Sequence, residues 1–186
     1  MQSFSQNCFS ETNINISKSL IDGCLNQERI QEYNKFSTKY FTLFSLQENV
    51  IDVVSPLISS YPNSEFGLFL AIILNKHILD ISQSLDNSKE KFEKYKNYLL
   101  NIYQSILQMN KAPKLLENIC SSISILIVIG INGNWTNGIE QLIGAAKENN
   151  GGNLGNILMA SLIISNINDT IEKLKEKIPK NNLEES

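Results

Sequence analysis

Hydrophobic residues recur along most of the chain at three- and four-residue spacings, which is the period of an amphipathic α-helix. In the first half this pattern predicts four helices, over residues 13–25, 27–46, 49–58 and 64–82. The second carries an aromatic stripe, which favours a packed core over a ligand site. The fourth is apolar almost all round, so we expect other helices to cover it on more than one side.

The second half continues in the same way. A linker at 85–88 precedes a long amphipathic helix at 89–109, whose Lys and Glu residues are interleaved on its polar face. Such mixing indicates a solvated helix surface rather than a nucleic-acid patch. The stretch Ala112–Ala146 is the one around which the chain is organised: a helix from Pro113 to about Ile129, a turn at 130–134, and a helix opened by Trp135. A further apolar helix is expected over 154–171.

Taken together, these helices form pairs over 13–46, 49–82, 88–130 and 135–171, with starts spaced by roughly 40 residues. A helix-pair period of about 40 residues is typical of HEAT and armadillo arrays. The sequence therefore predicts an all-α fold, specifically a HEAT/armadillo-like α-α superhelix of about four antiparallel pairs. Residues 1–12 are expected to be a flexible N-terminus, and 172–186 a charged tail or the start of a further repeat.

Composition narrows the function classes. Hydrophobic residues make up 42% of the chain and charged residues 19%, a balance that supports a folded core. The net charge of −3 gives no basic field for direct nucleic-acid binding. The most hydrophobic run, Ile119–Ile131, is interrupted by serines near its start and is shorter than the ~20 residues needed to span a bilayer. We therefore expect a buried helix and no membrane partner.

The chain offers little for catalysis. Cys8, Cys24 and Cys120 are widely spaced and form no CxxC motif, which argues against zinc or a disulfide framework and for a reducing compartment. His77 is the only histidine and has no Cys or carboxylate at ligand spacing, which argues against metal binding and general-base work. The Gly-rich segment 151–155 follows a helix and lacks the Lys-Ser/Thr of a phosphate loop. We expect no enzyme activity, no metal and no cofactor.

Four segments between residues 65 and 174 carry a family resemblance. EFGLFLAIILNKHI at 65–78 has Phe69, Ala71, Lys76 and Ile78 at the positions of an inner-helix motif. The longest segment, 115–143, has an apolar helix, a short turn, a Trp and a helix ending in Leu-Ile; segments 97–108 and 157–174 match in order. In these respects the chain resembles the N-terminal HEAT repeats of the importin-β (karyopherin) superfamily, nearest the transportin-SR and importin-thirteen branch. Members of that family are several times longer than this chain.

The resemblance implies a segment of a nuclear transport receptor that shuttles between cytoplasm and nucleus. In the family, the N-terminal arch binds the GTP form of the small GTPase Ran through inner helices, and Ran controls the binding of protein cargo. The implied contact residues here are Lys76 and His77, with Glu117, Asn118 and Ser121 as weaker candidates. The simpler interpretation is that Lys76 and His77 are only the solvent edge of their helix.

A second hypothesis explains the same periodicity without Ran. The chain would be a non-enzymatic helical-repeat adaptor or scaffold, with other protein subunits of a larger assembly as its partners.

Overall fold

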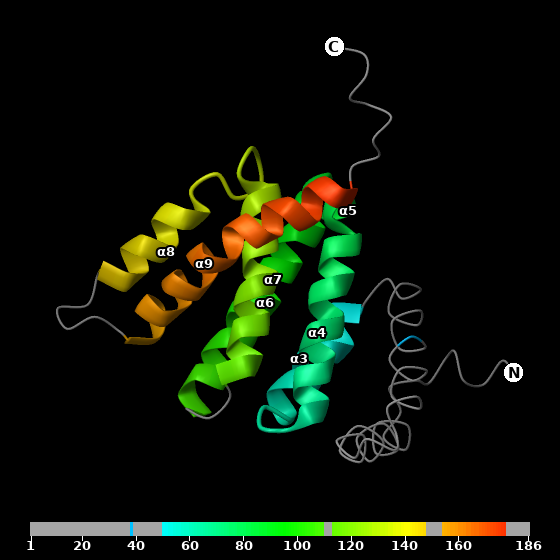
Figure 1. Ribbon diagram of the computed structural model, residues 1–186, viewed down its shortest axis with the longest axis vertical. Coiled ribbons are helices and arrows are strands. Elements are labelled where there is room, and N and C mark those ends of the chain that lie inside the picture. Colours follow the sequence, from blue (N-terminus) through cyan, green and yellow to red (C-terminus); the bar gives the residue numbers. More distant parts are fainter. Residues whose placement is uncertain (1–37, 39–49, 110–112, 148–153, 178–186) are drawn as a thin grey trace, which may run out of the picture. The chain divides into compact units, whose positions relative to one another are not determined.

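The computed structural model describes residues 38, 50–109, 113–147 and 154–177 (Figure 1). Within these ranges the secondary structure is helical and contains no strand, which confirms the predicted all-α class for the described part. The predicted helices at 13–46, the N-terminus at 1–12 and the Gly-rich loop fall outside the described residues. The helices are α3 (Val50–Ser60), α4 (Glu65–Asp80), α5 (Ser82–Asp86), α6 (Lys89–Met109), α7 (Pro113–Gly130), α8 (Gly138–Lys147) and α9 (Leu154–Lys177).

A tight turn joins α3 to α4. The Ser64 hydroxyl accepts the backbone N–H of Gly67 at 3.0 Å, which makes Ser64 the N-cap of α4. The same hydroxyl donates to the Tyr61 carbonyl at 3.0 Å. A Cβ atom on Gly67 would lie 2.0 Å from that carbonyl oxygen, so the turn closes only around a glycine.

Helix α6 matches its predicted range, and Ser88 caps it. The Ser88 carbonyl accepts the N–H of Phe92 at 2.9 Å, and its side chain lies 3.4 Å from the N–H of Lys91. Its buried residues recur at helical spacing: Phe92, Tyr95, Leu99, Ile102, Tyr103 and Ile106. Leu107 is half-buried. This burial agrees with the amphipathic pattern that predicted α6.

The predicted helix at 64–82 was too long. Helix α4 ends at Asp80, and Ile81 adopts φ −94° and ψ 11°, outside the helical region. The chain then turns into the short helix α5, where a linker was predicted. Leu85 on α5 is fully buried, and burying this side chain favours the turn over a straight continuation of α4.

Two further boundaries differ from prediction. Trp135 does not open a helix, because residues 131–137 form turns and α8 begins at Gly138. Within these turns the backbone N–H of Trp135 donates to the Gly130 carbonyl at 2.7 Å. Helix α9 was expected to end near 171 but continues to Lys177. Ion pairs from Lys175 to Glu172 and from Lys177 to Asp80 hold its last turns.

The chain divides into two compact units. Unit 1 comprises residues 1–77 and 98–119, and unit 2 comprises 78–97 and 120–186. Helices α4, α6 and α7 each contribute residues to both units. In unit 2, Phe92 in the first turn of α6 lies against Gly130 at the end of α7, so these helices run antiparallel. Helix α8 packs on α9 in the same unit (Figure 1).

Helix α7 is the most extensively buried long helix. By length and composition it is apolar enough to cross a membrane, the one such helix among the residues described, and 61% of it is buried inside the protein. Ser124 places its hydroxyl 2.9 Å from the Cys120 carbonyl and 3.2 Å from the Ile163 carbonyl of α9, so the buried hydroxyl is satisfied internally. Burial of this kind is typical of a core helix.

Candidate protein-binding surface

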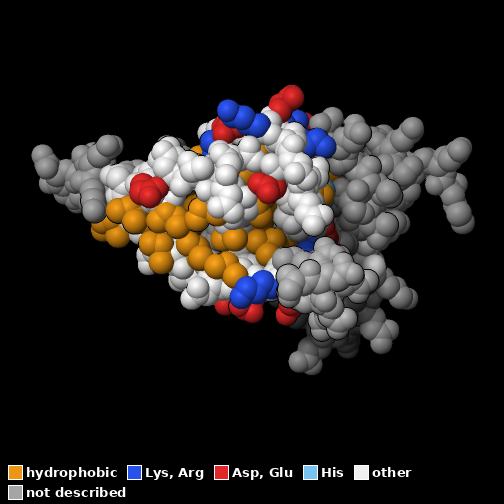
Figure 2. Space-filling model, turned by 90° about the horizontal axis from the view of Figure 1, so that it is seen from above, with side chains coloured by type: hydrophobic (Ala, Val, Ile, Leu, Met, Phe, Trp, Pro, Cys, Tyr) orange, Lys and Arg blue, Asp and Glu red, His pale blue; other side chains and the backbone are white. Residues whose placement is uncertain are grey.

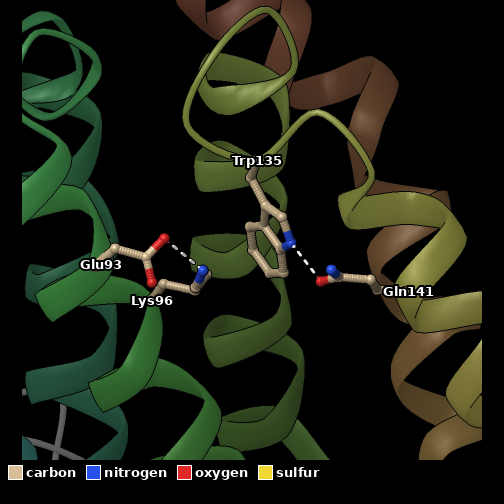
Figure 3. Close-up of polar contacts among 4 residues, drawn as sticks. All are labelled: Glu93, Lys96, Trp135 and Gln141. Carbon is tan, nitrogen blue, oxygen red and sulfur yellow. Dashed lines mark hydrogen bonds and ion pairs between the residues drawn. The ribbon is translucent and has the colours of Figure 1, made fainter.

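Trp135 joins three segments of unit 2. Its indole N–H donates to the side-chain oxygen of Gln141 on α8 at 2.9 Å (Figure 3). Its ring meets Phe92 of α6 edge-on, with centroids 6.4 Å apart. Only 5% of Trp135 is exposed. The turn between α7 and α8 is therefore held by an aromatic side chain whose polar atom is paired.

A charged pair covers the outer face of this tryptophan. The Lys96 ammonium lies 5.2 Å from the centre of the Trp135 ring, within cation–π range. The same ammonium pairs with Glu93 at 2.6 Å on α6 (Figure 3). These polar groups engage each other and the ring, so the cluster packs the turn against α6.

Glycines fit closely around the ring. A Cβ atom on Gly130 would lie 2.6 Å from the Phe92 ring, and one on Gly138 would lie 3.0 Å from the Trp135 ring. The Gly and Asn residues of this segment predicted a turn. The glycines at its two ends, Gly130 and Gly138, are required by close packing against aromatic rings rather than by backbone flexibility.

The predicted contact residues on α4 have different environments. Lys76 is exposed, whereas His77 is 4% exposed. A partner could therefore reach Lys76 but not His77 without opening unit 1, to which both residues belong. The interpretation that both residues form the solvent edge of α4 holds for Lys76 and is wrong for His77.

The predicted contact residues on α7 also differ from one another in exposure. Glu117 is exposed, and Asn118 is half-buried with its amide donating to the Lys114 carbonyl of its own helix at 2.9 Å. Ser121 is half-buried and belongs to unit 2, whereas Glu117 and Asn118 belong to unit 1. These residues therefore differ both in exposure and in the unit to which they belong.

Sequence reasoning missed the most exposed apolar surface. On α9, Leu154 is 82% exposed and Ile164 is 51% exposed, and Ile157 and Leu158 between them are also exposed. Ile157, Leu158 and Ile164 follow Leu154 by three, four and ten residues, which places the four on one face, and the exposed Ser161 lies among them. We call these four hydrophobic residues the α9 stripe. Figure 2 shows hydrophobic side chains gathered in a continuous band on the side where α8 and α9 lie.

The α9 stripe lies in an uncharged part of the helix. Residues 154–168 contain no charged side chain, and the charges of α9 begin at Asp169. The opposite face of the helix is buried through Met159, Ala160 and Ile163. Because α9 is apolar on both faces, its sequence pattern did not reveal which face other helices would cover.

Over the ranges that the structure describes, no three His, Cys, Asp or Glu side chains come together as metal ligands. Cys120, the free cysteine there, is fully buried in α7.

The indole hydrogen bond can be tested directly. We expect Gln141→Leu to lower the free energy of unfolding by about 0.5–1.5 kcal/mol, because the Trp135 N–H loses its partner. Trp135 is the only tryptophan, so its fluorescence during urea unfolding reports on this site. Gln104→Leu, at an exposed position of α6, is the matched control and should change stability little. Equal stability of the two variants would contradict the packing role assigned to this contact.

No protein-family model, curated protein or solved structure matches this chain, so its function has to be inferred from its residues and their geometry.

Proposed function

We propose that this chain is a non-enzymatic helical adaptor that binds another protein through the α9 stripe. The observation that carries the proposal is the exposure of four large aliphatic side chains on one uncharged helix face. Contiguous apolar surface of this kind marks interaction sites, whereas single exposed hydrophobic residues are ordinary.

The geometry of the stripe fits a particular mode of binding. From Leu154 to Ile164 the stripe extends along ten residues of helix, or about 15 Å at 1.5 Å per residue. Anchors at these helical spacings are those of a helix packed against another helix or laid into a groove. The partner surface would therefore be apolar and helical or groove-shaped, with no need for charge complementarity over this length.

We also propose that the helices stack as HEAT-like pairs in a superhelix. The spacing of about 40 residues between the predicted pairs supports this arrangement. So do the antiparallel packing of α6 and α7 and the packing of α8 on α9. In such arrays each pair packs only against its neighbouring pairs.

A second candidate is the transport function implied by the importin-β resemblance. Its support is that Lys76 on α4 and Glu117 on α7 are both exposed, as residues contacting Ran would have to be. Under this proposal the partners are GTP-bound Ran and protein cargo, and the chain works in both cytoplasm and nucleus. His77 would support α4 from inside rather than contact the GTPase.

The adaptor proposal predicts the effect of one substitution on α9. Ile157→Asp places a charge in the stripe and should abolish retention of a specific partner from an extract of the source cells, measured by quantitative mass spectrometry. Ile72→Asp on α4 is the matched control, because Ile72 is 46% exposed and Ile157 is 45% exposed. Both substitutions should leave the fold intact. Retention of the same proteins by both variants would refute the role of the stripe.

The transport proposal predicts nucleotide-dependent binding. The chain should retain GTP-loaded Ran and not GDP-loaded Ran, and Lys76→Glu should weaken that binding roughly tenfold by reversing a contact charge. Lys89→Glu, at an exposed position of α6, makes the same charge change elsewhere and should have little effect. Equal binding of both nucleotide forms, or binding of neither, would rule out this function.

A further inference from the structure

Unit 2 contains a cavity of about 610 Å³ that neither proposed function uses. Its walls come from the end of α4, from α5, from the end of α7 and from the last turns of α9. This volume is in the range of sites that hold small organic ligands. Its lining combines carboxylates with an aliphatic wall, so it suits a ligand that has both a charge and an apolar part.

The two carboxylates that line the cavity, Asp80 and Asp86, differ in their interaction partners. Asp80 is paired with Lys177, the last residue of α9. Over the described ranges, no hydrogen bond or ion pair engages the carboxylate of Asp86. The backbone of Asp86 is held in place, because its carbonyl accepts the side-chain N–H of Asn134 at 2.7 Å. Asp86 is exposed, so its carboxylate is accessible to a cation from solution.

Helix ends add to the negative potential. Helices α4 and α7 end at Asp80 and Gly130, and the residues of their last turns line the cavity. The C-terminal end of a helix carries a partial negative charge from its unpaired carbonyls. The one cation in the lining, Lys177, is already committed to Asp80.

The apolar wall is formed by Val128 and Ile129 of α7 and Leu174 of α9. All three side chains are half-buried, so they can bury an alkyl chain without rearrangement of the core. An anionic ligand would meet Asp80 and Asp86, and a purely polar cation would leave this wall exposed to water. The lining therefore selects a cation attached to a short aliphatic chain.

We propose that this cavity binds an alkylammonium group. The ammonium pairs with Asp86, and the alkyl chain lies on Val128, Ile129 and Leu174. A free polyamine and a lysine side chain of another protein both present this chemistry. The site does not depend on the adaptor proposal, because Leu174 is sixteen residues beyond Leu158 and lies roughly opposite the stripe at 100° per residue.

Titration of the full chain with defined probes tests the chemistry, with binding followed by calorimetry or by shifts of amide resonances. Butylamine should bind saturably, and 1-butanol, its neutral analogue, should bind at least about tenfold more weakly. Spermidine and N-acetyl-lysine methylamide then distinguish the two sources, and the tighter of the two identifies the source. Equal binding of butylamine and butanol, or no saturable binding of any amine, would overturn the proposal.

Three variants test which residues of the cavity bind the amine. Two of them should change the affinity for butylamine in opposite directions, and the third is a control. Asp86→Asn should weaken butylamine binding about tenfold. Lys177→Met frees Asp80 as a second carboxylate and should strengthen binding, an outcome that a purely structural role of Lys177 would not produce. Glu117→Gln removes the same charge as Asp86→Asn from an exposed position in unit 1 and should leave binding unchanged. Equal weakening by Asp86→Asn and Glu117→Gln would show non-specific attraction and overturn the site.

Discussion

The burial of α7 is the constraint on which the rest of this structure depends. The helix Pro113–Gly130 is too apolar to be left in water, and its leucines and isoleucines are mostly less than a tenth exposed. Each such side chain contributes about 1.5–3 kcal/mol when it is fully buried. Both compact units include part of this helix. The polar groups inside are accommodated locally, as the Ser124 hydroxyl shows by bonding to backbone carbonyls of α7 and α9.

The end of α7 determines how the chain continues. Trp135 folds back on the helix end, bonds to Gln141 and packs on Phe92, and glycines make room for its ring. This arrangement leads into α8 and then α9, which packs one face inward and leaves the other exposed. The apolar surface on α9 is thus a consequence of how the core is closed. Helix α9 supplies residues to two candidate sites, the stripe near its start and the cavity at its end.

The sequence predicted those features of the fold that depend on interactions between residues close in sequence. The Ser64 and Ser88 caps, the start of α7 at Pro113 and the inward face of α6 were all predictable, because capping and helical period act within a few residues. The break at Ile81 and the position of Trp135 in a turn were not predictable. Each depends on tertiary burial of a side chain, Leu85 in the first case and the indole, which packs on Phe92, in the second.

The candidate sites were less predictable for the same reason. The sequence placed Lys76 and His77 together on one helix edge, but adjacent residues on a helix point in different directions, and the structure exposes one and buries the other. The α9 stripe was not predicted because large aliphatic residues occur on both faces of the helix, and only the tertiary arrangement decides which of these faces is covered. The cavity brings Asp86, Val128 and Lys177 together from three segments, which no local pattern reveals.

Native-state hydrogen exchange of the full chain in aqueous buffer tests the central claim, that α7 is the buried core helix and the start of α9 is an open face. The amides of α7 between Leu116 and Ile127 should exchange most slowly, at a rate limited by global unfolding, and those of the first turns of α9 should exchange faster. Exchange of the α7 amides as fast as those of α9, or their protection only when detergent or lipid is added, would contradict it.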